Sequence, residues 1–186
     1  MIGYAFCGSY CTFARSFSAL CTLVSEGYDV QPIMSERAYS TDTRFFLAED
    51  FRKAVEEKTG RKIIHSVRDA EPLGPMTPLD ALIIAPCTGN TLAKLARGIT
   101  DSAVTMAAKA HLRSDRPLLI ALASNDAMSQ NLSSLSSLVC RRSVYFVPMH
   151  QDDTVKKPYS LVADMEMIPM ALSALERGEQ LRPLFI

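Results

Sequence analysis

The stretch DALIIAPCTGNTLAKLARGITDS, which runs from Asp80 to Ser102, decides the fold of this chain. Its first part, 81–86, is apolar throughout and ends at Pro86, and apolar residues recur at helical spacing from Thr91 onward. A fully apolar strand followed at once by a helix is typical of a parallel sheet that helices cover on both faces. The corner between strand and helix holds more hydrogen-bonding side chains than a simple turn needs, namely Cys87, Thr88, Asn90 and Thr91.

Apolar runs and helical periods alternate along the rest of the chain in the same way. We predict strands at 2–6, 29–34, 62–67, 81–86, 117–123 and 143–148, and helices at 13–24, 45–58, 92–99, 104–112, 128–139 and 161–175. Pro32 suggests a bulge or short pairing in the second strand, and Pro169 suggests a kink in the last helix. Three prolines and a glycine in 70–78 predict an irregular connection. The pattern predicts one domain, 1–186, with an α/β fold: a three-layer α/β/α, Rossmann-like arrangement around a mainly parallel sheet.

Composition narrows the class of protein. Twenty Lys and Arg residues balance twenty Asp and Glu residues, so the net charge is zero. This balance argues against a nucleic-acid binder or an electrostatic membrane anchor, and it favours self-association. No apolar run approaches the roughly 20 residues of a membrane span. Five cysteines without a CxxC pair indicate a reduced, cytoplasmic protein, and the three widely separated histidines predict no metal site.

Polar clusters follow the predicted strands at their carboxyl ends, where ligands bind in folds of this kind. In the first, CGSYCT, Gly8 permits a tight turn and Ser9 offers a hydroxyl beside the N-terminus of a helix. A helix N-terminus favours a phosphate, although the serine could equally serve only as a cap. Ser35, at the end of the second strand, can donate to the same phosphate or stand in an ordinary turn.

Two further clusters point to a planar, hydrogen-bonding ligand. In APCTGNT, Gly89 allows a tight turn, and the polar atoms exceed what a single helix cap requires. In ASNDAMSQN, either Asn125 or Asp126 could cap the next helix, or Asn125 could face the ligand with Met128 as a soft wall. We therefore expect one site, built from several strand ends.

These motifs resemble the flavoprotein family of FMN-binding, homo-oligomeric cysteine decarboxylases and flavin prenyltransferases. The shared features are the GS turn after the first strand, the serine after the second, the pattern AP-x-x-x-NT and the pattern N-x-x-M. Longer segments are similar to the dipicolinate synthase B subunits of spore-forming bacteria, and this similarity spans the whole chain. They are AEPLGP, APCTGNTLAKLA, ITDSAVTMAAKAHLR, SNDAM, FVPMHQDD and KKPYSLVADM.

The resemblance implies roles for particular residues. Gly8, Ser9 and Ser35 would hold the phosphate of FMN, and the flavin and its ribityl chain would lie against Pro86, Cys87, Thr88, Gly89, Asn90 and Thr91. Thr105 and Met106 would also approach the cofactor, and Asn125 and Met128 match the substrate-recognition motif of the decarboxylases.

The chain also departs from the decarboxylase pattern. It reads LASN where they have a proline-containing motif, Ser129 follows Met128, and there is no Trp at all. His65 lies in the region of their catalytic histidine, but a longer connection separates it from the strand that follows. The decarboxylation chemistry is therefore not carried over.

The similarity to the B subunits implies an oxidoreductase subunit. Together with an A subunit it would oxidise dihydrodipicolinate to dipicolinate, an aromatic dicarboxylate, in the mother cell during sporulation. The hydride acceptor would be FMN, or NAD(P) on the A subunit, and Lys109, Arg113, Lys156 and Lys157 are candidates to pair with the carboxylates. A trimer or dodecamer is implied. Two alternatives remain open: a free-standing FMN-dependent decarboxylase or prenyltransferase, and a non-catalytic partner subunit.

Overall fold

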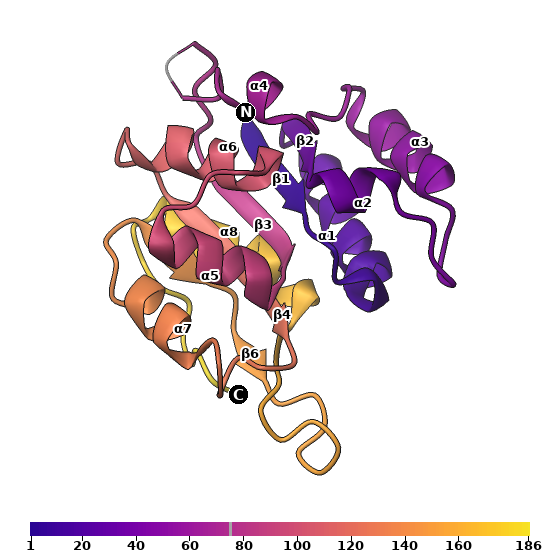
Figure 1. Ribbon diagram of the computed structural model, residues 1–186. Helices are drawn as coiled ribbons and strands as arrows, with labels where there is room; N and C mark the ends of the chain where they lie inside the picture. Colours follow the sequence, from indigo (N-terminus) through magenta and orange to yellow (C-terminus); the bar gives the residue numbers. More distant parts are fainter. Residues whose placement is uncertain (75) are drawn as a thin grey trace.

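The computed structural model describes residues 1–74 and 76–186. Its centre is a seven-stranded sheet in the order β2-β1-β3-β4-β7-β6, with β5 paired to β4 beside β7 (Figure 1). The strands are β1 (Ile2–Phe6), β2 (Val30–Met34), β3 (Leu82–Cys87), β4 (Leu118–Ser124), β5 (Val144–Phe146), β6 (Met149–His150) and β7 (Leu161–Ala163). The helices are η1 (Tyr10–Thr12), α1 (Phe13–Ser25), α2 (Glu36–Ser40), α3 (Ala48–Thr59), α4 (Val67–Ala70), α5 (Gly89–Arg97), α6 (Ala103–Leu112), α7 (Leu132–Val139), η2 (Met165–Met167) and α8 (Ile168–Glu176).

Helices cover both faces of the sheet, and each face has its own apolar cluster. Successive strand residues point to opposite faces, so Tyr4 and Phe6 pack with α1, α3 and α8, whereas Ala5 packs with α5, α6 and α7. The pairs β1–β2, β1–β3, β3–β4 and β4–β5 are parallel, and only the pairs that involve β7 are antiparallel. The predicted three-layer α/β/α fold with a mainly parallel sheet is confirmed.

The second strand tolerates its proline without a bulge. β2 pairs with β1 in unbroken register from Ile2↔Val30 to Phe6↔Met34. Pro32 lies opposite Tyr4, and its outer side meets no full strand: its carbonyl accepts from the amide of Ile64. A proline fits an edge strand because it removes no ladder bond there. The register shift lies elsewhere, between Ile84 and Cys87 where β3 pairs with β4.

Two predicted elements, and the kink predicted at Pro169, differ from the structure. The predicted strand 62–67 is a single bridge between Ile33 and Ile64, after which Ser66 caps the short helix α4. The predicted helix 161–175 is divided into β7, η2 and α8. Pro169 stands in the first turn of α8 and causes no kink, because the amide that proline lacks has no helical partner there.

One smaller difference concerns a helix boundary. The helix predicted at 128–139 begins only at Leu132, and Met128 lies in the turns before it. In the connection 70–78, Pro75 lies outside the described residues. None of the described helices is long and apolar enough to cross a membrane.

Candidate functional site

The carboxyl ends of β1, β2 and β3 surround a cavity of about 420 Å³, called here the strand-end cavity. Carboxyl ends of neighbouring parallel strands meet at one edge of a sheet, so the topology brings three separate polar clusters together. The lining residues are Cys7, Gly8, Ser35, Glu36, Arg37, Thr88, Asn90, Thr91, Lys94, Asp101 and Ser102. A volume of this size falls within the range of small-molecule and cofactor sites, roughly 300–1,000 Å³.

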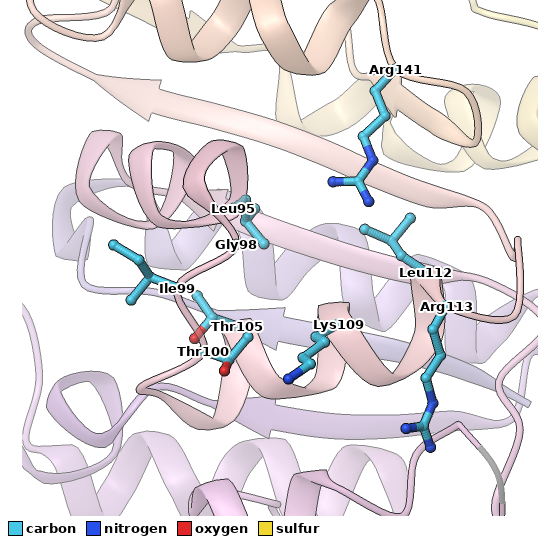
Figure 2. A pocket seen from close by; sticks show the side chains of 9 residues that line it. All are labelled: Leu95, Gly98, Ile99, Thr100, Thr105, Lys109, Leu112, Arg113 and Arg141. Atoms are coloured by element: carbon cyan, nitrogen blue, oxygen red, sulfur yellow. The ribbon is translucent and has the colours of Figure 1, made fainter.

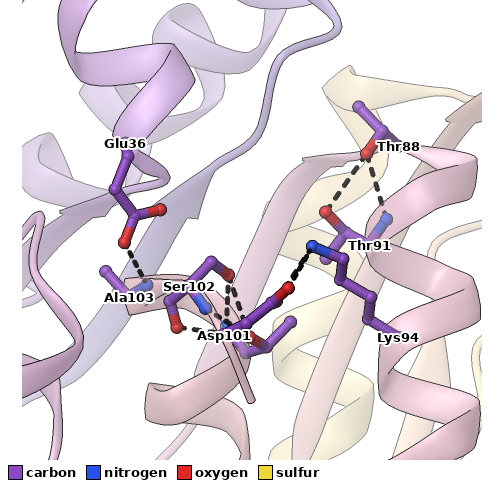
Figure 3. Close-up of polar contacts among 8 residues, drawn as sticks. Glu36, Thr88, Thr91, Lys94, Asp101, Ser102 and Ala103 are labelled. Carbon is purple, nitrogen blue, oxygen red and sulfur yellow. Dashed lines mark hydrogen bonds and ion pairs between the residues drawn. The ribbon is translucent and has the colours of Figure 1, made fainter. Parts of the chain in front are cut away.

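The N-terminus of α5 forms one wall of the strand-end cavity. The Oγ1 of Thr88 accepts a hydrogen bond from the amide of Thr91 (3.2 Å) and donates one to its Oγ1 (3.1 Å), as Figure 3 shows. Thr88 thus caps the helix through the Thr91 amide, and among the described residues the amides of Gly89 and Asn90 have no partner. These free amides carry a partial positive charge suited to polar or anionic groups. Asn90 is exposed, and within the described residues its side chain makes no hydrogen bond. This wall therefore offers donors that the protein itself does not use.

Charged side chains close the opposite rim. The Nζ of Lys94 contacts both carboxylate oxygens of Asp101 at 2.9 Å, and the Oε1 of Glu36 accepts from the amide of Ala103 (3.1 Å), as Figure 3 shows. The nearby ammonium of Lys94 lowers the pKa of Asp101 below its usual value, so this carboxylate stays charged. The bond from Glu36 also joins α2 to the start of α6. The rim is consequently charged but largely neutralised within itself.

The start of α5 packs against a polar cluster formed by the last residue of β4 and the segment after it. The carboxylate of Asp126 accepts from the Oγ of Ser124 and from the Nδ2 of Asn131 (2.9 Å). Gly89 lies directly against these groups: a Cβ added there would approach all three within 2.8 Å. Only glycine fits this contact, so the cluster fixes the path of the backbone into α5.

The buried cysteines beneath the cavity stay neutral. Burial raises the pKa of the Cys7 thiol to about 11 and that of Cys87 well above its usual value. A thiol nucleophile needs its deprotonated form. Cys7 and Cys87 therefore act as small apolar walls.

A second cavity of about 250 Å³ lies next along the sheet edge, between the loop after β1 and the end of β4; we call it the β4 cavity. Ser9, Thr12 and Arg15 line one side and Asn125 and Lys157 the other, with Cys11, Ala123, Ser124, Asp152 and Val162 completing it. Lys157 pairs with Asp152. Gly8 lines the strand-end cavity and Ser9 the β4 cavity, so one loop separates the two.

The structure thus divides the residues predicted to hold the cofactor. The strand-end cavity is shared by Gly8, Ser35, Thr88, Asn90 and Thr91, whereas Ser9 lines the β4 cavity together with Asn125, which was predicted to contact the substrate. Pro86, Cys87 and Gly89 are buried beneath them.

Three predicted site residues, and His65, lie away from both cavities. The hydroxyl of Thr105 forms a capping box with Ser102, and Met106 packs against the apolar cluster below α6. Met128 packs against the same cluster, and its amide donates to the carbonyl of Tyr159. His65 stacks on Tyr39 at 3.7 Å between ring centres.

Six charged residues of the two cavities were not predicted from the sequence, namely Arg15, Glu36, Arg37, Lys94, Asp101 and Asp152. One signal was available for the ion pair. Gly98, just after α5, has the positive φ of 70° that ends many helices, and a chain reversal there returns Asp101 toward Lys94.

Comparison with known proteins agrees with this architecture. The flavoprotein family model matches residues 1–168. The chain is 41% identical over 185 residues to the dipicolinate synthase B subunit of Bacillus subtilis (strain 168), covering 100% of this chain and 92% of that protein. The crystal structure of the dipicolinate synthase B subunit from Bacillus halodurans superposes with a TM-score of 0.91 at 38% identity, covering 100% and 95% of the two chains.

A more distant structure shares the fold alone. It is a dodecameric FMN-dependent UbiX-like decarboxylase from Escherichia coli O157:H7, with a TM-score of 0.66, 22% identity and coverage of 97% and 96%. The family match spans most of the chain, and the similarity to the two B subunits spans all of it. The chain therefore belongs to the flavoprotein family, among the dipicolinate synthase B subunits.

Proposed function

We propose that this chain binds FMN in the strand-end cavity and acts with an A subunit to oxidise dihydrodipicolinate to dipicolinate. The observation that carries the proposal is the set of unused donors at the start of α5, facing Gly8 and Ser35 across a cavity of about 420 Å³. The membership of the flavoprotein family supports a flavin, and the similarity to the B subunits supports the reaction.

The residues of the cavity fit the parts of FMN. Gly8 leaves the loop after β1 open, since a Cβ there would meet nothing closer than the Tyr10 hydroxyl at 3.5 Å. A phosphate would lie at Gly8 and Ser35, and the ribityl chain and ring at Thr88, Asn90 and Thr91. FMN, when bound, supplies a two-electron acceptor. Glu36 and Asp101 repel a phosphate less than two free carboxylates would. Asp101 is paired with the ammonium of Lys94, and Glu36 accepts a hydrogen bond from the Ala103 amide.

The proposal places the substrate in the β4 cavity. Oxidising a dihydropyridine removes a hydride and a proton; FMN, or NAD(P) on the A subunit, would supply the hydride acceptor, and the proton would pass to solvent. The dicarboxylate needs cationic or amide partners, and Arg15, Lys157 and Asn125 offer them beside the proposed flavin. Two of the cations expected for this task, Lys109 and Arg113, line a different cleft.

A homo-oligomer is part of the proposal. The E. coli relative of this fold is dodecameric, and a chain with zero net charge has little mutual repulsion to oppose assembly. We propose a trimer or dodecamer that also binds the A subunit.

The test is flavin binding to the purified chain. Added FMN should give the absorbance bands of a bound flavin at roughly 370 and 450 nm, a property of the cofactor. Asn90→Ala should raise the Kd for FMN by about 2- to 10-fold, the effect of one hydrogen bond, and leave folding intact because the Asn90 amide has no partner among the described residues. Gln130→Ala, an exposed amide outside both cavities, is the matched control.

Two results would contradict the proposal. If no FMN binds even at high concentration, the chain is not an FMN-binding protein. If the Kd for FMN is unchanged in Asn90→Ala, FMN does not bind in the strand-end cavity. If FMN binds but the rate of the A subunit does not change when this chain is added, the catalytic part of the proposal is wrong.

A further inference from the structure

A third cleft, of about 190 Å³, lies between the C-terminal end of α5, one face of α6 and the turn after α7, and we call it the cationic cleft (Figure 2). Three basic side chains line it: Lys109 and Arg113 from α6, and Arg141 from the turn after α7. Figure 2 shows Arg141 reaching from that turn toward α6. Leu95, Ile99 and Leu112 form its apolar part, and Gly98, Thr100 and Thr105 complete it.

The charge of the cleft is not balanced by the protein. No acidic residue lines it, and within the described chain none of its three cations forms an ion pair. The acidic residues at the two ends of α6 are engaged elsewhere. Asp101 pairs with Lys94, and Asp115 pairs with Arg142 (3.3 Å) and accepts from the hydroxyl of Ser143 (2.6 Å). A chain of zero net charge therefore concentrates three positive charges around one small cavity.

Helix dipoles explain only part of this arrangement. Cations near a helix C-terminus are stabilising, and all three basic residues stand near such an end. Each helix C-terminus carries the equivalent of only about −0.5 charge. The ends of α5, α6 and α7 together therefore offset about 1.5 of the three positive charges on Lys109, Arg113 and Arg141. The cleft keeps a net positive potential that an anion would neutralise.

The apolar part of the cleft selects among anions. Ile99 is 46% exposed although it stands between two helices, and Leu112 is half-buried. Beside them, the Thr100 hydroxyl makes no hydrogen bond with the described residues. A flat apolar body would cover the leucine and isoleucine side chains while its charged groups meet the basic rim. The volume of about 190 Å³ suits a single ring and is below the size usual for nucleotide or cofactor sites.

We propose that the cationic cleft is a second ligand site, distinct from the strand-end and β4 cavities, that binds a small aromatic dicarboxylate. One carboxylate pairs with Arg141 and the other with Lys109 or Arg113, and the ring lies on Ile99 and Leu112. The site does not need a flavin, so it stands whether or not the chain binds FMN.

The experiment is calorimetric titration of the full chain with benzene-1,3-dicarboxylate at low and high salt. We expect saturable binding that weakens at high salt, because exposed charge pairs are screened. Arg141→Gln and Lys109→Gln should each raise the Kd by up to about fivefold, the range of a single exposed ion pair. Arg142→Gln is the control, because Arg142 is adjacent in sequence, pairs with Asp115 and does not line the cleft.

Three outcomes would overturn the proposal. Equal affinity for inorganic phosphate would show a general anion patch without an apolar part. Equal affinity for neutral benzene-1,3-dicarboxamide would remove the role of the cations. Loss of binding in Arg15→Gln or Lys157→Gln, with no change in Arg141→Gln or Lys109→Gln, would place the ligand in the β4 cavity. Circular dichroism of each variant confirms that the fold is retained.

Discussion

Replacing Gly89 by alanine should destabilise the protein because the new Cβ enters the polar cluster behind α5. The Cβ would lie 2.5 Å from the Oγ of Ser124, 2.7 Å from the Oδ1 of Asp126 and 2.8 Å from the Nδ2 of Asn131. These atoms must move by roughly 0.7 to 1 Å to reach ordinary contact near 3.5 Å. Such a shift breaks hydrogen bonds to the carboxylate, which contribute about 1.5 to 3 kcal/mol each.

The net effect is smaller than the sum of the lost bonds. Alanine is favoured over glycine inside a helix by up to about 1 kcal/mol, and Gly89 is the first residue of α5. Overpacking itself costs about 1 to 3 kcal/mol. We therefore expect Gly89→Ala to lower the free energy of unfolding by about 2 kcal/mol, measured by urea denaturation followed by circular dichroism.

Gly8→Ala is the matched control, because its Cβ would meet only the Tyr10 side chain, at 3.5 Å or more. Its free energy of unfolding should stay within about 0.5 kcal/mol of the unsubstituted protein. If the two variants are equally stable, the contact between Gly89 and the cluster of Ser124, Asp126 and Asn131 does not limit the size of residue 89, and the reasoning is refuted.

Two further predictions concern charge. Asp101→Asn removes a carboxylate from the strand-end cavity and frees the ammonium of Lys94 to meet the FMN phosphate. The Kd for FMN, measured by absorbance titration, should therefore fall by about 3- to 5-fold at low salt and by less at high salt. Weaker binding of FMN would contradict this prediction. Burial lowers the pKa of His111, whose Nε2 bonds to the Pro117 carbonyl and whose Nδ1 has no partner in the described structure. The unfolded chain therefore takes up this proton first, and stability should fall as the pH drops through about 6.5 toward the lower folded pKa. His111→Gln should flatten the dependence between about pH 7.5 and 5.5 in urea denaturation, and an unchanged slope would show that another group titrates.

The central strands could be predicted from the sequence because they are buried on both faces. The apolar runs 81–86 and 117–123 lie within one residue of β3 and β4. Burial on both faces leaves a local signal that does not depend on knowing the neighbours.

The elements at the sheet margins could not be predicted in this way. Residues 161–175 carry apolar side chains at helical spacing, yet Leu161–Ala163 forms β7. β5 pairs only with the first part of β4, at Leu118–Ile120, so Ala123 and Ser124 on the same edge of β4 pair with β7 instead. Residues 161–163 form a strand because the edge of β4 beyond Ile120 is available for pairing. The local sequence of 161–163 does not indicate that this edge is available.

The segment 94–105 shows why the sequence alone places too many residues in one site. Thr105 is expected beside the cofactor together with Thr91, but Lys94 and Asp101 line the strand-end cavity whereas Leu95 and Thr105 line the cationic cleft. Neighbouring residues of an α-helix point about 100° apart, since 3.6 residues complete a turn. A single helix and the connection after it can therefore form walls of two cavities, and a motif that is contiguous in sequence divides between them. The strand ends indicate where a site lies, but the helix phase decides which side chains enter it.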